Sequence, residues 1–164
     1  MKINGVLGII INSNNQILLT KRTDIPIWCL PGGNIEYREN PKKAIIREIF
    51  EETGFKVKIV KINGVYERMD FEHVRKDNKQ FTCQVFTCKI LKSNFKPNGE
   101  VSKIKFFDMS RLPYSLMYWQ RDIIRDVLTK RKKIVKMNLK MELIKLFLHP
   151  YILYKIIRWK IKYN

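Results

Sequence analysis

The pattern of apolar and polar residues predicts an α+β fold, in which a mixed β-sheet is flanked by helices and a basic helical extension ends the chain. Three observations support this prediction. Several short runs alternate apolar and β-branched residues with polar ones, as half-buried strands do. Two longer segments, near 41–53 and after Pro113, place apolar residues at helical spacing. From Thr129 onward, apolar residues are mixed with a large excess of lysine and arginine.

The first predicted elements are strands. Residues 5–11 and 16–20 are β-rich and are separated by Asn12 to Asn15, whose short polar side chains suit a tight turn. We therefore expect a β-hairpin at the amino terminus. Residues 27–30 form a short extended piece that ends at Pro31-Gly32-Gly33, because proline and glycine interrupt regular structure.

A helix is predicted next. It should begin at Asn40-Pro41, since proline suits the first helical turn, and it should end near Thr53 with Gly54 as its carboxyl cap. The remaining elements are strands at 56–68, 81–91 and 103–107 and a second helix bearing Trp119, Ile123 and Val127.

The charge divides the chain into two parts. The 164 residues contain 33 Lys and Arg and 15 Asp and Glu, a net charge of +18, which implies attraction to nucleic acid, anionic lipid or phosphorylated small molecules. Residues 129–164 carry 11 of the basic residues and one acidic residue, a net +10, and the preceding residues carry +8. We therefore expect one domain over 1–128 and a basic, apolar-rich helical extension over 129–164.

The three cysteines argue against two classes of protein. They are odd in number and lack zinc-type spacing, which disfavours a secreted disulfide framework and a zinc site. The first 11 residues do not have the order of regions found in a signal peptide. We therefore expect a cytoplasmic protein.

One segment, from Gly33 to Phe55, carries a recognisable chemical pattern. Its sequence is GNIEYRENPKKAIIREIFEETGF. On a helix, Glu48, Glu51 and Glu52 are related by i, i+3 and i+4, so their carboxylates should share one face. Three like charges repel, and a hard divalent cation relieves that repulsion. Ligands that are all oxygen favour Mg²⁺ or Mn²⁺ over zinc. The apolar residues expected to hold the opposite side against the sheet, with the acidic face outward, are Ile46, Ile49 and Phe50.

This segment resembles the Nudix box of the Nudix hydrolase family, because every defining position is filled at its expected spacing. A looser resemblance extends over roughly 1–128, and the extension lies outside it. The resemblance implies a Nudix-type α/β/α sandwich around a mixed sheet. It also implies a metal-dependent hydrolase that cleaves the pyrophosphate of a nucleoside diphosphate linked to another moiety, with Mg²⁺ or Mn²⁺ as cofactor.

The resemblance assigns metal ligands. It makes the Gly32 carbonyl a ligand beside Glu48 and Glu52, with Glu51 as a further ligand. In different family members the general base is the first Glu of the Arg-Glu pair, here Glu48, or a Glu from a later loop, for which Glu100 is the candidate. We favour Glu48, although spacing leaves both open.

Other positions of the box have supporting roles. Arg47 lies one helical turn before Glu51 and reaches Glu39 if the loop folds back, so we expect it to orient carboxylates. The structural positions of the box are Gly33, Glu39 and Gly54.

Two arginines are candidates for substrate contact. Arg38 stands where family members very often have glycine, so either the loop conformation differs there or Arg38 contacts phosphate. Arg22, which closes the second strand, either steers phosphate or ends an edge strand. The subfamily signatures downstream of the box are missing, so the substrate and its leaving group stay open.

Two other functions compete with the hydrolase, and three interpretations compete for the extension. The alternatives are a non-catalytic sensor of a nucleotide or ADP-ribose-type ligand, and a pyrophosphohydrolase acting on the 5′ end of RNA. Residues 139–161 are apolar but interrupted by charges, and Pro150 should split them into two helical pieces. We favour packing on the domain or in a homodimer, then a peripheral membrane helix, and then a nucleic-acid contact.

Overall fold

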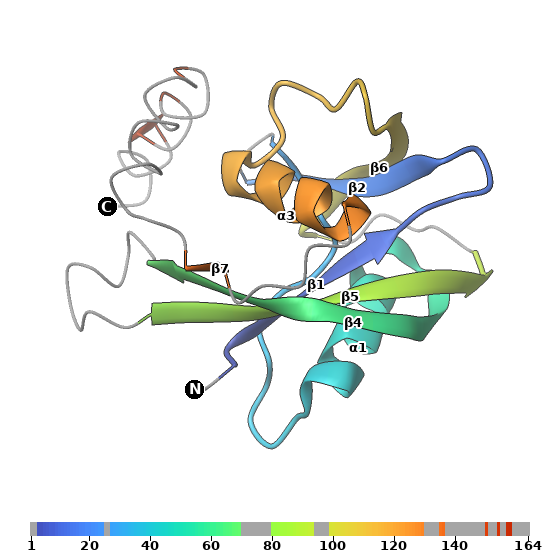
Figure 1. Ribbon diagram of the computed structural model, residues 1–164, viewed down its shortest axis with the longest axis vertical. Coiled ribbons are helices and arrows are strands. Elements are labelled where there is room, and N and C mark those ends of the chain that lie inside the picture. Colours follow the sequence, from blue (N-terminus) through green and yellow to red (C-terminus); the bar gives the residue numbers. More distant parts are fainter. Residues whose placement is uncertain are drawn as a thin grey trace.

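The computed structural model describes residues 3–24, 27–69, 80–93, 99–129 and 135–136, together with residues 150, 154, 157 and 158. Figure 1 shows the arrangement of the elements. In chain order they are β1 (Gly5–Ile10), β2 (Gln16–Arg22), β3 (Trp28–Cys29), α1 (Pro41–Thr53), β4 (Lys56–Met69), β5 (Gln80–Lys92), β6 (Val101–Asp108), α3 (Tyr118–Leu128) and β7 (Val135–Lys136).

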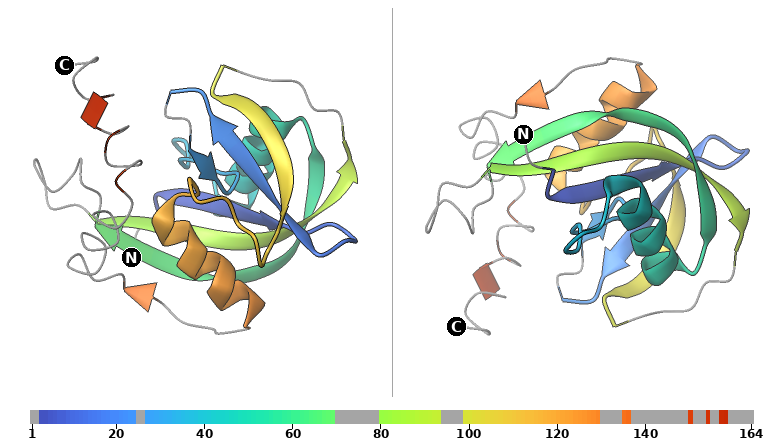
Figure 2. Two further views of the ribbon diagram at one scale, coloured as in Figure 1. Left: turned by 90° about the horizontal axis from the view of Figure 1, so that it is seen from above. Right: turned by 90° about the horizontal axis from the view of Figure 1, so that it is seen from below.

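The strands form two sheets. The larger sheet has the order β1-β5-β4-β7, in which β1 is parallel to β5, β4 is antiparallel to β5 and β7 is parallel to β4. The smaller sheet, β3-β2-β6, is antiparallel. The two helices α1 and α3 lie on opposite sides of the larger sheet (Figure 2). The predicted α+β class with a mixed sheet between helices is therefore confirmed.

The predicted amino-terminal hairpin is wrong. The turn itself is tight, because the Asn12 side chain accepts hydrogen bonds from the backbone N–H groups of Asn14 and Gln16. Beyond one bridge between Ile11 and Ile17, however, β1 and β2 enter different sheets. The edge of β1 that does not pair with β5 is hydrogen-bonded to the loop at 31–34. That loop leaves no edge on which β2 could pair.

The helix α1 forms as its end signals predict. The Asn40 side chain accepts a hydrogen bond from the Lys43 N–H, Pro41 occupies the first turn, and Gly54 caps the carboxyl end with φ of 67°. Its buried face differs from the expected one, since Ile49 is buried but Ile46 and Phe50 are 40% and 50% exposed. The residues that α1 buries are Ala44, Ile45, Ile49, Glu52 and Thr53.

The core has a cluster on each side of the larger sheet. The α1 side includes Val6, Leu18, Val57, Phe86 and Cys88. The α3 side is built around Trp119 and Ile123, which pack with residues of β1, β2, β4 and β5. Because α1 is held by the first cluster alone, its polar edge is free to face the loop at 31–34.

Most of the predicted extension lies outside the described residues. This includes the two helical pieces expected within 139–161. Its described strand, β7, pairs with β4 at Tyr66 and Glu67. Within the described part of the chain, none of the helices is long and apolar enough to cross a membrane.

Candidate active site

The loop at Pro31-Gly32-Gly33 is held flat against β1. The N–H of Val6 donates to the Gly33 carbonyl at 2.9 Å, and the N–H of Gly8 donates to the Pro31 carbonyl at 2.8 Å. Between them, the Gly32 carbonyl accepts no backbone hydrogen bond from the described residues. Gly32 has φ of 144°, and a Cβ there would overlap the Val6 carbonyl oxygen. Only glycine fits this close approach.

Two carboxylates of α1 lie against this loop. The Gly32 N–H donates to Glu52 Oε2 at 3.0 Å. A Cβ on Gly33 would stand 2.6 Å from both carboxylate oxygens of Glu48, so the absence of a side chain at Gly33 makes room for that carboxylate. The fold therefore brings Gly32 beside Glu48 and Glu52, although these carboxylates lie 16 and 20 residues after it in the chain.

Burial makes these carboxylates costly in their charged form. Glu52 is buried, and desolvation raises its pKa to about 8; the nearby charges of Glu48 and Glu100 act in the same direction. Desolvation also raises the pKa of Glu48, although Arg47 opposes the shift. A bound cation would relieve both groups.

The donor set fits Mg²⁺ or Mn²⁺. Two carboxylates beside a backbone carbonyl are hard oxygen ligands. Over the described ranges, no three His, Cys, Asp or Glu side chains stand together as a complete metal site. The candidate site therefore consists of Glu48, Glu52 and the Gly32 carbonyl, and the remaining ligands would come from Glu51, water or substrate.

Arg47 links the acidic residues to one another. Its guanidinium donates to both oxygens of Glu39, at 3.0 and 2.9 Å. It also donates to Glu48 at 3.1 Å and to Glu51 at 3.0 Å. The contact with Arg47 is the main cause of the lowered pKa of Glu39. Arg47 thus contacts Glu39 and Glu51, the carboxylates that we expected it to orient. The Glu51 side chain is half-exposed.

Arg22 and Glu100 come to the same side of the molecule. The backbone N–H and the hydroxyl of Thr23 both donate to the Glu100 carbonyl, which ties the loop before β6 to the end of β2. Glu100 is close enough to raise the pKa values of Glu48 and Glu52. The positive charge of Arg22 acts to lower the pKa of Glu52. The Arg22 guanidinium donates two hydrogen bonds to Asp24, at 2.8 and 2.6 Å.

Comparison with known proteins identifies this arrangement. The model of the NUDIX domain matches residues 1–127. The chain belongs to the NUDIX domain family.

Two of the relatives are named for enzymatic activities. The chain is 34% identical over 120 residues to the ADP-ribose pyrophosphatase of Methanocaldococcus jannaschii. The match covers 71% of this chain and 68% of that protein. It is 44% identical over 68 residues to a putative 8-oxo-dGTP diphosphatase of Bacillus subtilis. That match spans 42% of this chain and only 46% of the B. subtilis protein.

Two solved structures have a similar fold. The crystal structure of a UDP-X diphosphatase has a TM-score of 0.67 and 29% identity, covering 79% of this chain and 63% of that chain. The MutT protein from Methanosarcina mazei Go1 also has a TM-score of 0.67, at 23% identity, covering 80% of this chain and 96% of that one. The latter likeness shows the fold alone.

Arg38, which departs from the NUDIX pattern, adopts a backbone conformation that glycine favours. Arg38 has φ of 62°, in the left-handed region that favours glycine. Its guanidinium lies over the Tyr37 ring, 5.0 Å from the ring centroid. The loop therefore keeps a conformation suited to glycine while carrying an arginine.

Three residues that support the NUDIX site were not predicted. The buried side chain of Gln120 accepts a hydrogen bond from the Leu30 N–H at 2.6 Å. It thus ties α3 to the start of the loop at 31–34, which we call the glycine loop. Asn34 accepts from Arg47 through its carbonyl, and Asp24 holds Arg22. Only Gln120 had a sequence signal, because it is a polar residue directly beside the apolar stripe of α3.

Proposed function

We propose that this chain hydrolyses the pyrophosphate of a nucleoside diphosphate linked to another moiety, with Mg²⁺ or Mn²⁺ as cofactor. The observation that carries the proposal is the meeting of two partly desolvated carboxylates, Glu48 and Glu52, with the Gly32 carbonyl. The relatives named for ADP-ribose pyrophosphatase, 8-oxo-dGTP diphosphatase and UDP-X diphosphatase activity support the same class of reaction.

The proposed roles follow from the contacts. Glu48, Glu52 and the Gly32 carbonyl would hold the metal, with Glu51 as a further ligand. When bound, a divalent cation neutralises pyrophosphate charge and lowers the pKa of water. Glu48 accepts the proton of the attacking water, and Glu100 is the alternative acceptor. Arg47 positions the carboxylates and does not touch substrate.

The two arginines complete the proposed site. Asp24 holds Arg22 in one orientation, so its exposed edge is available to a phosphate with little loss of side-chain entropy. Arg38 is the second candidate for phosphate contact. The cytoplasmic location and the contacts expected of 129–164 stay predictions.

A phosphate-release screen tests the proposed function. The full chain is incubated with nucleoside diphosphate derivatives, mononucleotides and triphosphorylated RNA, with Mg²⁺ or Mn²⁺, beside Glu52→Gln as control. We expect metal-dependent release from at least one diphosphate derivative that the variant loses. Ligand binding with no turnover would favour the sensor, and a salt-dependent preference for RNA would favour the 5′-pyrophosphohydrolase.

A further inference from the structure

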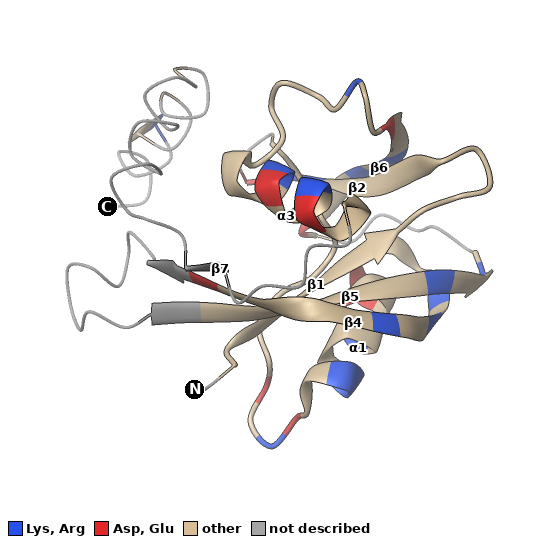
Figure 3. Cartoon of the chain, viewed as in Figure 1, with Lys and Arg blue, Asp and Glu red and all other residues tan. Residues whose placement is uncertain are grey.

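Five lysines gather at the end of β4 and β5 that lies away from β7. Lys56 stands directly opposite Lys92, and Lys58 stands directly opposite Lys89. Lys61 follows on β4, and all five side chains are exposed. Figure 3 shows these basic positions along that end of the two strands. Like charges directly opposite one another destabilise a sheet, so this arrangement has an energetic cost.

No acidic residue offsets these charges nearby in the strands. Residues 56–66 and 81–92 contain neither Asp nor Glu. None of the ion pairs found among the described residues includes one of the five lysines. The local positive charge is therefore available to an external anion.

Aliphatic side chains are exposed among the lysines. Val60 and Leu91 are 60% and 62% exposed. The pairing of β4 with β5 shifts register between Ile59 and Lys61, so the strand bulges at Val60. We call Val60, Leu91 and the five lysines the β4–β5 basic surface.

This surface lies away from the acidic site. Val57, Phe86 and Cys88 pack toward α1, so the alternation of a strand turns Lys58 and Lys89 to the opposite face. The helix α3 covers that face farther along, over Tyr66, Cys83 and Val85. In Figure 1 the end of β4 and β5 that carries the lysines extends beyond α3.

We propose that the β4–β5 basic surface docks on a membrane surface that carries anionic headgroups. The ammonium groups would meet the headgroup phosphates and carboxylates, and Val60 and Leu91 would enter the boundary between headgroups and acyl chains. A nucleic-acid backbone would pair its phosphates with the lysines but would provide no apolar surface for the aliphatic side chains. Lysines at a strand edge also prevent edge-to-edge pairing, but that role does not call for exposed aliphatic residues between them.

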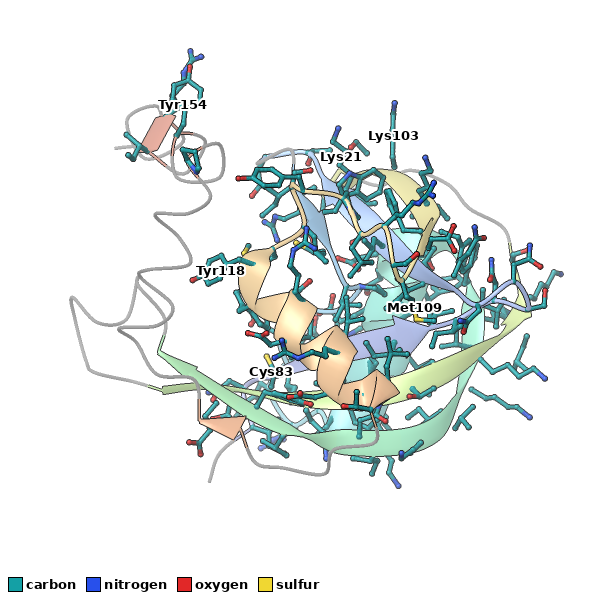
Figure 4. The ribbon with its side chains drawn as sticks, turned by 45° about the horizontal axis from the view of Figure 1, so that its top comes forward. Lys21, Cys83, Lys103, Met109, Tyr118 and Tyr154 are labelled. Carbon is teal, nitrogen blue, oxygen red and sulfur yellow. The ribbon has the colours of Figure 1, made fainter. Side chains whose placement is uncertain are left out.

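Vesicle co-sedimentation of the full chain tests this proposal. Vesicles of phosphatidylcholine with phosphatidylserine are compared with vesicles of phosphatidylcholine alone. The variants are Lys58→Glu with Lys89→Glu, and Val60→Ser with Leu91→Ser. The matched control is Lys103→Glu with Lys105→Glu on β6, in the other sheet. Figure 4 labels Lys103 far from β4 and β5. Thermal melts establish that each variant is folded.

We expect binding only to the anionic vesicles. The lysine variant should lose about tenfold or more in affinity, and the aliphatic variant should lose severalfold, while the control changes little. Hydrolysis in solution should be unchanged, because the surface lies on the other face of the sheet from Glu48 and Glu52. Failure of hydrolysis in every protein would thus count against the proposed function and not against this surface.

Three results would overturn the proposal. The first is no binding of the full chain to anionic vesicles. The second is binding that neither double variant weakens, which would assign the contact to 129–164. The third is equal loss in the control, which would show that net charge alone drives binding. Oligonucleotide binding that falls with the lysine variant but not with the aliphatic variant, in the absence of vesicle binding, would replace the membrane with nucleic acid.

Discussion

At the scale of single residues, the candidate site depends on the absence of side chains at Gly32 and Gly33 and on the desolvation of two carboxylates, Glu48 and Glu52. Gly33 leaves space that the Glu48 carboxylate uses, and Gly32 offers an N–H to Glu52. Both carboxylates have raised pKa values because they are withdrawn from water. The protein holds these groups in a state that a divalent cation would stabilise.

The first prediction concerns the Glu52 carboxylate. Glu52→Gln should lower turnover by about two or more orders of magnitude, because the amide removes charge that holds the cation. The variant should stay folded, since its carbonyl oxygen can still accept from Gly32. Turnover at saturating metal and thermal unfolding check this together. Near-normal turnover would remove Glu52 from the site.

The second prediction is the pH dependence of the metal-free protein. The pKa of Glu52 is about 8 when folded, against an ordinary value of 4.5. Between these values the folded chain keeps a proton that the unfolded chain has released, so stability should fall as the pH rises from about 5 to about 8. Melting in a chelator should show this fall for the native chain and a flatter profile for Glu52→Gln. Parallel profiles would contradict it.

At the scale of elements, the site lies where α1, the glycine loop and the loop before β6 meet. The caps of α1 fix which residues begin and end the helix. Hydrogen bonds from β1 fix the glycine loop, and Gln120 of α3 supports it from the other side. The loop that carries Glu100 is held by Thr23. Each element is therefore anchored independently of a ligand.

The third prediction separates α1 from the loop before β6. If Glu48 is both metal ligand and base, Glu48→Gln should reduce catalysis far more than Glu100→Gln, and the loss should persist at high metal concentration. Turnover of both variants across a metal titration measures this. The reverse ranking would move the base to Glu100.

The fourth prediction concerns the loop before α1. The left-handed backbone conformation costs a residue with a side chain about 1–2 kcal/mol, which glycine avoids. Part of that gain is lost, because glycine also increases the conformational entropy of the unfolded chain. Arg38→Gly should therefore raise stability by about 0.5–1 kcal/mol, while Arg38→Ala should not. Urea unfolding of the two variants compares them. A rise in KM in both would support a phosphate contact, and equal stabilities would rule out backbone strain at Arg38.

At the scale of the whole molecule, charge and burial divide the surface into distinct regions. The acidic site lies on the α1 side of the larger sheet, and the β4–β5 basic surface lies on the other face. The extension meets the sheet through β7, beside Tyr66 and Glu67. Hydrolysis and surface contacts can therefore be tested separately.

The fifth prediction concerns the extension. Removal of 133–164 should lower the melting temperature and promote aggregation, because it removes β7 from the edge of β4. If the extension packs on the domain, its removal also exposes the apolar faces of Trp119, Val127 and Leu128. Calorimetry and light scattering check this. Unchanged melting and activity with loss of binding to anionic vesicles would instead make the extension a membrane element.

The sequence alone determined the α+β class, the bounds of α1, the family and the acidic residues, because each depends on spacing within one segment. Asn40, Gly54 and the three glutamates act over a few residues. Tertiary structure decided the rest. The loop at 31–34 displaced β2 from β1, Glu52 became buried against Gly32, and Lys58 came to face Lys89. These outcomes depend on which distant segments compete for the same edge or the same volume, and local spacing does not contain that information.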